Sequence, residues 1–340
     1  MSRYFEPKSI AKLKERLLPG EKAVVVTHLN PDGDAVGAAT AVAHWLRSCS
    51  MEPQVIIPDR YPSFLSFMDS NEEVLFFESS RERATQLIDN ATLIVMVDFN
   101  QLSRSGDMEP TIAASSAYKV LIDHHIEPKR EEFDLLIHSS EVSSTCELLY
   151  WLLREMGVEI GLSLANSLYI GMMTDTNNFN NSVTSDTLLM ASHLLSLGVD
   201  KELFQKRIFA SFSQERMRLM GHLLLNRFTL LENYRLGYLT LSLEDQLKFN
   251  YRKGDSEGFV NLPLRIEEVD IAILFTQLHN SIRVSLRSKE GYSVNDLAIR
   301  HFNGGGHKMA AGGTLYIPFG DIDRFLLDSL KESYKICRDE

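Results

Sequence analysis

The chain has no long apolar run and few cysteines. None of the apolar runs in its 340 residues reaches the length of a membrane-spanning helix. The first residues also lack the apolar core of a secretory signal. The three cysteines, Cys49, Cys146 and Cys337, are odd in number and far apart, which is not the pattern of a disulfide framework. We therefore expect a cytoplasmic protein with no membrane association.

Positive charge is also in short supply. The chain has 35 Lys and Arg residues against 46 Asp and Glu residues, so its formal net charge is −11. Proteins that hold long duplexes need many cationic contacts to phosphate, and this composition argues against long duplex DNA as a partner. A hydrophobic content of 44% and a charged content of 24% are typical of a globular protein. The length is sufficient for two domains.

Three short apolar runs each end in side chains that can bind a metal. These are His28, Asp32 and Asp34 after residues 23–26, Asp98 after residues 93–97, and Asp123, His124 and His125 after residues 119–122. Pro31 and Gly33 disfavour a helix through the first group, which is therefore expected to be a loop. Val- and Ile-rich runs separated by helical stretches predict a buried parallel sheet. Ligands bind outside the carboxyl ends of such strands, so these side chains should converge.

The chemistry of these side chains favours one class of metal. Imidazole and carboxylate donors without a thiolate indicate Mn²⁺, Mg²⁺ or another borderline-hard ion rather than a structural zinc. Asp175 follows a predicted helix and is a further candidate ligand. Taken singly, each feature has a common structural alternative. Asp98 and Asp175 could cap or end helices, and Pro31-Asp32-Gly33 could be a polar turn.

The patterning predicts an α/β protein with two domains. We expect a parallel-sheet domain with helices on both faces in residues 1–190 and a helical linker in residues 191–225. A smaller α/β domain with a mixed sheet should follow in residues 226–340. There, strand patterns at 235–241, 269–277 and 281–287 precede a glycine-rich loop at 303–306 and a helix at 325–334. In the first domain, Ser144 and Glu147 fit the spacing of a capping box.

Together these motifs resemble a known family. H-x-N-P-D-x-D-x-x-G at 28–37, Asp98, D-H-H at 123–125 and D-T-x-x-F at 175–179 are similar to the motifs of the DHH phosphoesterases. The glycines and His307 at 304–307, followed by M-A-A-G at 309–312, resemble the signature of the DHH-associated C-terminal domain. The resemblance covers roughly residues 15–335. It is greatest for the small cytoplasmic subgroup similar to bacterial nano-RNA oligoribonucleases, some of which also dephosphorylate 3′-phosphoadenosine 5′-phosphate.

The resemblance implies two divalent metal ions, most simply Mn²⁺, with Mg²⁺ or Co²⁺ as alternatives. It assigns one ion to His28, Asp32 and Asp98. It assigns the other to a set that shares Asp98 as a bridge, namely Asp34, Asp98, His124 and Asp175. In the family pattern, His125 would be a catalytic residue that faces the substrate. Asp98 would be catalytic because it bridges the two metal ions, and Asp123 would orient its neighbours.

Candidate substrate-binding residues lie mainly in the second domain. Those that could contact phosphate are Arg104, Arg287, Gly304, Gly305, Gly306 and His307. The ordinary alternatives are a solvated loop charge for Arg104, a surface strand arginine for Arg287, and a tight turn between strands for the glycines. Asn177 and Asn303 occupy positions where the family usually has glycine. Asparagine tolerates a positive φ better than most residues, so we expect the backbone to be preserved.

The expected activity is that of a metal-dependent phosphoesterase. The implied substrates are short oligoribonucleotides, cleaved to 5′-mononucleotides, and 3′-phosphoadenosine 5′-phosphate, converted to AMP, held in a cleft between the two domains. The alternatives are a linear or cyclic dinucleotide phosphodiesterase, a pyrophosphatase, and a nucleotide sensor without turnover. The sequence does not fix the oligomeric state, and a homodimer is among the assemblies considered.

Overall fold

A computed structural model describes residues 4–69, 73–210, 212–252 and 254–333. The chain forms two compact units, residues 1–211 and 212–340. The predicted linker region, 191–225, contains parts of three helices. Of these, α7 (Ser185–Ser196) and α8 (Lys201–Phe209) belong to the first unit and α9 (Gln214–Asn226) to the second. The division into residues 1–190, a linker and 226–340 stays a prediction.

The first unit is built on a six-stranded sheet in which every paired strand is parallel. Its order is β3-β2-β1-β4-β5-β6. The strands are β1 (Lys22–Val26), β2 (Glu52–Ile57), β3 (Leu75–Phe76), β4 (Leu93–Val97), β5 (Tyr118–Asp123) and β6 (Leu135–His138). The strand order reverses direction between β1 and β4. In open parallel sheets this reversal opens a crevice at the carboxyl ends of the two strands, which is the usual binding site.

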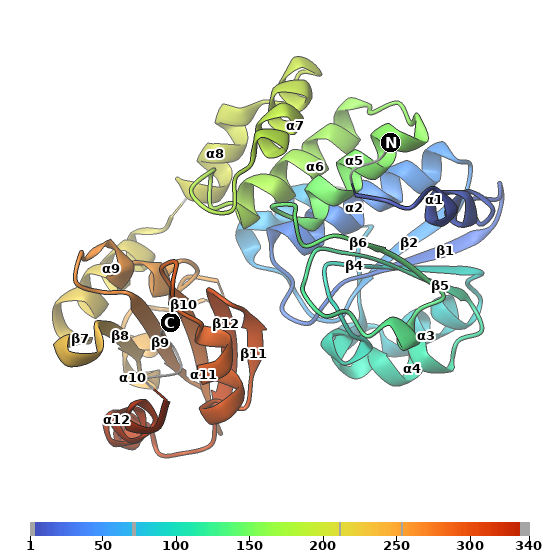
Figure 1. Cartoon of the computed structure of the whole chain (residues 1–340). Helices are drawn as coiled ribbons and strands as arrows, with labels where there is room; N and C mark the ends of the chain where they lie inside the picture. Colours follow the sequence, from blue (N-terminus) through green and yellow to red (C-terminus); the bar gives the residue numbers. More distant parts are fainter. Residues whose placement is uncertain (1–3, 70–72, 211, 253, 334–340) are drawn as a thin grey trace. The chain divides into compact units, whose positions relative to one another are not determined.

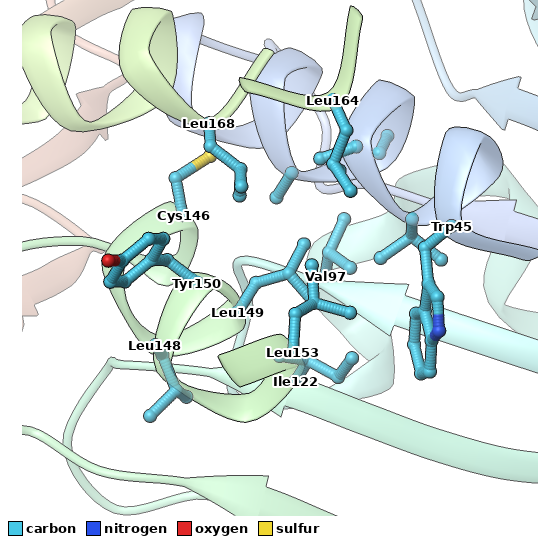
Figure 2. Close-up of a cluster of buried hydrophobic side chains, with 14 of the residues drawn as sticks. Trp45, Val97, Ile122, Cys146, Leu148, Leu149, Tyr150, Leu153, Leu164 and Leu168 are labelled. Atoms are coloured by element: carbon cyan, nitrogen blue, oxygen red, sulfur yellow. The ribbon is translucent and has the colours of Figure 1, made fainter. Parts of the chain in front are cut away.

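Helices cover both faces of this sheet (Figure 1). They are α1 (Pro7–Lys14), α2 (Gly33–Ser48), α3 (Arg81–Asp89), α4 (Glu109–Ala114), α5 (Thr145–Met156) and α6 (Leu162–Asp175), with 3₁₀ segments at Ser63–Asp69, Phe77–Ser79, Leu102–Met108 and Arg130–Glu132. Alternate residues of one strand enter two cores. In β4, Val95 and Val97 pack with α2, α5 and α6, whereas Ile94 packs with α3 and α4. Figure 2 shows the first core, where Val97 and Ile122 of the sheet meet Trp45 and Leu149.

Helices α2 and α6 cross at glycines, so their backbones approach closely. A Cβ on Gly37 would lie 2.8 Å from the carbonyl oxygen of Ser167, and a Cβ on Gly171 would lie 2.2 Å from Cys146 Sγ. Because α2 starts beside β1 and α6 ends at Asp175, this crossing places Asp34 and Asp175 at the same edge of the sheet. The packing of two helices therefore contributes directly to the candidate site.

The second unit contains a mixed sheet of order β11-β12-β10-β9-β8-β7, in which only β8 and β9 pair in parallel. Its strands are β7 (Phe228–Leu231), β8 (Leu236–Leu241), β9 (Ile271–Gln277), β10 (Ile282–Ser288), β11 (Gly305–His307) and β12 (Ala310–Leu315). Its further helices are α10 (Leu243–Lys248), α11 (Val294–His301) and α12 (Ile322–Ser333), with 3₁₀ segments at Glu232–Tyr234, Phe259–Asn261, Pro263–Arg265 and Phe319–Asp321. The predicted fold class is confirmed. Within the part of the chain described, no helix is long and apolar enough to cross a membrane.

Two local predictions need correction. The glycine-rich segment that was expected to be a loop instead forms most of edge strand β11, which pairs with β12. The capping box at Ser144 is only half formed. Ser144 Oγ accepts the backbone N–H of Glu147 at 3.0 Å, but the Glu147 carboxylate accepts from Ser143 N at 2.9 Å and from Thr187 Oγ1 at 2.8 Å. These tertiary donors take the place of the N–H of Ser144.

Candidate metal centre

The loop after β1 is fixed by its own polar groups. Asp32 caps α2, and its Oδ1 accepts from the backbone N–H groups of Asp34 at 2.9 Å and Ala35 at 3.1 Å. This bond also turns the chain so that Asp34 enters the first turn of the helix. On the other side, Asn30 has a φ of +55° and donates its N–H to Asp59 Oδ1 at 2.6 Å. The loop is therefore held at both ends.

The structure brings the predicted ligands of both metal sites together. Three groups of side chains each have potential ligand atoms within 4.8 Å of one another. They are His28, Asp32 and Asp98; Asp34, His124 and Asp175; and Asp98, His124 and His125. Asp98 therefore lies next to His28 on one side and His124 on the other. The first group holds the three residues of one predicted ligand set, and the second holds three of the four residues of the other. The assignment of these residues as ligands stays a prediction.

Asp98 has a geometry suited to a shared ligand. It follows β4 with a φ of +67° and is 3% exposed. Its Oδ2 lies 3.4 Å from His28 Nε2, and its Oδ1 lies 3.7 Å from His124 Nε2. The two oxygens of one carboxylate thus face the two histidines that belong to different groups. A carboxylate that bridges two cations needs this arrangement, in which each of its oxygens faces a different group of ligands.

His28 has the tautomer that a metal ligand needs. Its Nδ1 is 2.9 Å from the backbone carbonyl oxygen of Leu29, so Nδ1 carries the proton that this acceptor requires. The lone pair is left on Nε2, the atom nearest Asp98. Histidine ligands in metalloproteins are commonly fixed by such a bond from the second ring nitrogen.

The amino end of α5 supplies donors to two of the carboxylates. The backbone N–H groups of Thr145 and Cys146 donate to Asp34 Oδ2 at 2.7 Å and Asp34 Oδ1 at 3.0 Å. The hydroxyl of Thr145 donates to Asp98 Oδ1 at 2.9 Å. The first turn of a helix has free N–H groups and a partial positive charge, which suit a carboxylate.

The electrostatics of the cluster fit a cation. Burial, and after it the negative charge of Asp32, raises the pKa of Asp34 to about 6. Burial and the carboxylates of Asp34 and Asp32 raise the pKa of Asp98 well above its ordinary value. Clustered carboxylates disfavour one another's ionised form unless positive charge is nearby. Oxygen and imidazole donors with this excess negative charge suit divalent cations such as Mn²⁺ or Mg²⁺.

The His125 side chain is held by a carboxylate partner, Asp123. Its Nδ1 lies 2.7 Å from Asp123 Oδ1, and Asp123 is fully buried. Burial lowers the pKa of His125, but the hydrogen bond with Asp123 and the charge of Asp98 outweigh it and raise the pKa overall. His138 of β6 contacts the backbone oxygen of His125 at 2.6 Å and fixes the segment from the adjacent strand.

Arg104 lies beside this histidine in the same unit. It belongs to the 3₁₀ segment Leu102–Met108, and its carbonyl oxygen accepts the N–H of Leu29 at 2.7 Å. Its positive charge acts to lower the pKa of His125. The structure therefore places Arg104 next to the metal ligands, where an anionic ligand could reach it.

In the second unit, the sheet register brings Arg287 and His307 into one row. Ala310 of β12 pairs with Arg287 of β10 on one side and with His307 of β11 on the other. The backbone of His307 is described, but its side chain lies outside the described part of the structure. The guanidinium of Arg287 donates to the carbonyl oxygen of Leu286 at 2.9 Å. Two of the predicted phosphate-binding residues thus lie at the same register on either side of Ala310, two strands apart.

The glycines of this segment have a structural reason to be there. A Cβ on Gly304 would lie 1.8 Å from the carbonyl oxygen of Gly312. The N–H of Gly304 donates to Ala298 O at 3.2 Å, and that of Gly306 donates to the Asn295 side chain at 2.7 Å. Gly305 is a ladder partner of Gly312. Gly304 and Gly306 therefore use their N–H groups within the protein.

Asn177 and Asn303 stand where the family usually has glycine, and each has a positive φ. Asn177 and Asn303 both have a φ of +47°, in the left-handed region that asparagine tolerates better than most residues. Both residues thus have a backbone conformation that glycine also adopts, and the preservation of the family's backbone there stays a prediction. Asn177 begins a run of three residues with positive φ directly after the α6 end that carries Asp175.

Sequence reasoning missed two residues of this region. Asp59 follows β2 by two positions, and the rule that found Asp98 would have found it too. Thr145 carries no such signal, because it is only the residue after a predicted helix cap. Its contact with Asp98 joins residues 47 apart in sequence, and no local pattern reports such a contact.

The fold and the clustered ligands define a class of protein. A parallel sheet whose switch point carries these groups, linked to a unit with a mixed sheet, is the architecture expected of a DHH phosphoesterase. The sequence matches the DHH family, N-terminal domain, over residues 22–172 and the DHHA1 domain over residues 235–332. The chain belongs to the DHH family, and it is a metal-dependent phosphoesterase.

Particular relatives extend this assignment over the whole chain. An exopolyphosphatase-related protein from Bacteroides fragilis has a crystal structure with a TM-score of 0.93, 35% identity and 99% of each chain covered. The bifunctional oligoribonuclease and PAP phosphatase NrnA of Thermus thermophilus is 28% identical over 86% of this chain and 83% of its own. The NrnA of Bacillus subtilis is 28% identical over 88% and 91%.

Proposed function

We propose that this protein hydrolyses short oligoribonucleotides to 5′-mononucleotides and converts 3′-phosphoadenosine 5′-phosphate to AMP. The observation that carries the proposal is the convergence of six candidate ligand side chains, Asp98 among them, at the switch point of the sheet. The two NrnA relatives, named as bifunctional oligoribonucleases and PAP phosphatases, support this choice of substrates.

The proposed ligand sets are His28, Asp32 and Asp98 for one cation, and Asp34, Asp98, His124 and Asp175 for the other. Mn²⁺ is the proposed metal, and Mg²⁺ and Co²⁺ are the alternatives. When bound, such cations lower the pKa of water and stabilise the charge that develops on phosphoryl oxygens. The residues of the chain keep Asp34 and Asp98 buried and fix the tautomer of His28.

His125 is the proposed acid. Asp123 holds Nδ1 of the ring, so the protonated imidazole presents Nε2–H to the leaving ribose oxygen. Proton transfer to that oxygen leaves a neutral ring and a neutral alcohol. Arg104, whose charge reaches His125, is the proposed contact to a phosphate in the first unit. Asp123 thus acts by orienting the histidine.

The second unit is proposed to recognise the nucleotide. Arg287 and His307, which share the cross-strand row through Ala310, are the candidate contacts. Arginine provides a planar fork that suits a phosphate. Since Gly304 and Gly306 use their N–H groups internally, we propose that these two glycines shape the strand edge and that the side chains of the row bind the ligand.

The test is a substrate panel with defined metals. A labelled RNA dinucleotide, 3′-phosphoadenosine 5′-phosphate, a cyclic dinucleotide, pyrophosphate and an RNA of about twenty nucleotides are each incubated with Mn²⁺, Mg²⁺, Co²⁺ or a chelator. We expect turnover of the first two, none with the chelator, and much lower catalytic efficiency on the long RNA. The net charge of −11 offers no extended cationic track for a long strand.

Each alternative gives a different pattern. Turnover confined to the cyclic dinucleotide or to pyrophosphate would replace the proposed substrates by those. Tight binding of nucleotides without turnover of any of them would indicate a sensor. Equal catalytic efficiency on the dinucleotide and on the long RNA would contradict the proposal that short ligands are preferred.

A further inference from the structure

One residue outside the predicted ligand sets contacts both of them. Thr145 donates its backbone N–H to Asp34 Oδ2 at 2.7 Å and its hydroxyl to Asp98 Oδ1 at 2.9 Å. Asp34 belongs to one group of potential ligands and Asp98 to the other two. A single residue therefore spans the two proposed metal sites without offering either of them a ligand of its own.

We propose that Thr145 is a positioning residue that fixes the two carboxylates at the separation needed by a pair of divalent cations. The inference rests on the proposed metal-dependent function. A carboxylate rotates readily about its last bond, so a bridging role requires something to set its plane. The Thr145 hydroxyl sets the direction of Asp98 Oδ1, and Asp98 Oδ2 is then turned toward His28.

The hydrogen bond from Thr145 to Asp98 lies in a buried environment. Thr145 is fully buried, and Asp98 is 3% exposed. Loss of the donor would leave a buried carboxylate oxygen short of a hydrogen bond, which is costly away from water. The β-branch of threonine also restricts rotation about χ1, so the hydroxyl keeps its direction. Burial and restricted rotation of the side chain therefore both keep the hydrogen bond from Thr145 to Asp98 in one geometry.

The amino end of α5 is itself anchored from the opposite side. The buried Glu147 accepts from Ser143 N at 2.9 Å and from Thr187 Oγ1 of α7 at 2.8 Å. These bonds hold the turn that carries Thr145 against α7, away from the ligands. The position of Thr145 therefore depends on the hydrogen bonds to Glu147, whereas its effect on Asp98 depends on its own hydroxyl. A substitution at Thr187, which bonds to Glu147, therefore serves as a matched control.

The experiment compares the same substitution at two buried threonines. Thr145→Val removes the hydroxyl that faces Asp98, and Thr187→Val removes a hydroxyl of the anchoring network that touches no proposed ligand. Thr145→Ser keeps the donor. For each purified, metal-free protein, we would measure Mn²⁺ affinity by calorimetric titration, thermal unfolding without metal, and turnover of the RNA dinucleotide.

We expect Thr145→Val to weaken Mn²⁺ binding by about ten- to a hundredfold, the usual effect of removing a group that orients a metal ligand. Thr145→Ser should recover most of the affinity. Thr187→Val should lower the unfolding temperature and leave the affinity for Mn²⁺ near that of the wild type. If Thr145→Val does not fold, Thr145→Ala removes the same hydroxyl without an added methyl group and carries the same expectation.

Wild-type Mn²⁺ affinity in Thr145→Val or Thr145→Ala would overturn the inference. Equal losses of affinity in Thr145→Val and Thr187→Val would also overturn it, because general loosening of α5 would then explain both. The outcome is separable from that of the proposed function. A wild-type protein that binds Mn²⁺ and hydrolyses no substrate refutes the function, whereas the comparison of metal affinities still decides the role of Thr145.

Discussion

The glycine at the crossing of α2 and α6 links packing to the metal centre, and Gly171→Ala tests that link. A Cβ at this position would lie 2.2 Å from Cys146 Sγ and 2.8 Å from Asp34 Oδ1. Cys146 is fully buried and Asp34 is 1% exposed, so neither side chain can move out into water. The added methyl group must therefore displace the helix, the thiol or the proposed ligand.

Two opposing effects determine how much Gly171→Ala changes the free energy of unfolding. Alanine favours a helix over glycine by about 1 kcal/mol, whereas overpacking a filled core costs about 1–3 kcal/mol. Because Asp34 is fixed by two backbone donors, we expect the upper part of the overpacking range and a net loss of about 1–2 kcal/mol. For a unit of this size, that loss lowers the unfolding temperature by roughly 2–8 °C. Affinity for Mn²⁺ should fall as well.

Gly221→Ala is the control. Gly221 lies within α9, and a Cβ there would meet nothing within 4 Å. The effect that remains is the higher helix propensity of alanine over glycine, so this variant should be more stable than the wild type by up to about 1 kcal/mol. Unfolding would be followed by circular dichroism and Mn²⁺ binding by calorimetry. A Gly171→Ala protein that matches the wild type in both stability and Mn²⁺ affinity would refute the reasoning.

Four further outcomes are expected. Asp98→Ala should abolish turnover, while stability without metal falls little or rises because clustered carboxylates repel one another; near-normal hydrolysis at moderate Mn²⁺ would exclude the bridging role. His125→Ala should slow hydrolysis by about 10²–10⁴-fold, and metal analysis should show unchanged metal content; if the metals are lost too, His125 is a ligand. Arg287→Ala should reduce kcat/KM on a dinucleotide by about ten- to a hundredfold and affect a nitrophenyl phosphate much less, so an unchanged ratio of the two substrates contradicts the assigned recognition role. Burial raises the pKa of Asp245, but bonds from Arg227, Ser242 and His222 bring it down to about 2. Its contribution to stability, about 2 kcal/mol, should therefore be complete above pH 3.8 and lost as the pH falls through about 2; acid titration of unfolding for wild type and Asp245→Asn should show this loss only in the wild type.

The sequence determined the strands that carry the ligands. The runs before His28 and Asp98 read as buried strands because both faces of a covered parallel sheet are apolar, and β1 and β4 are found there. Pro31 and Gly33 identified the intervening loop, and Asp32 was available as the cap of α2. Signals of this kind are local, so each can be read from a few neighbouring residues.

Tertiary structure decided what the chain alone does not specify. The short strands β3 and β6 were not predicted, because Leu75–Phe76 and Leu135–His138 give too little periodicity to distinguish a strand from a loop. Gly305 and Gly306 lie in an edge strand because β12 lies alongside and supplies a partner. Strand pairing depends on residues far apart in sequence, and a turn-prone segment becomes a strand once it is paired.

The contacts that adjust the candidate site have the same origin. Thr145 meets Asp98 only because α5 packs onto the sheet beside β4 and β5, and Asp59 meets Asn30 only because β1 and β2 are neighbours. The candidate ligands were visible in the sequence because each follows a strand or ends a helix. The groups that hold those ligands in place were not visible, because their role is set by packing between segments that are distant along the chain.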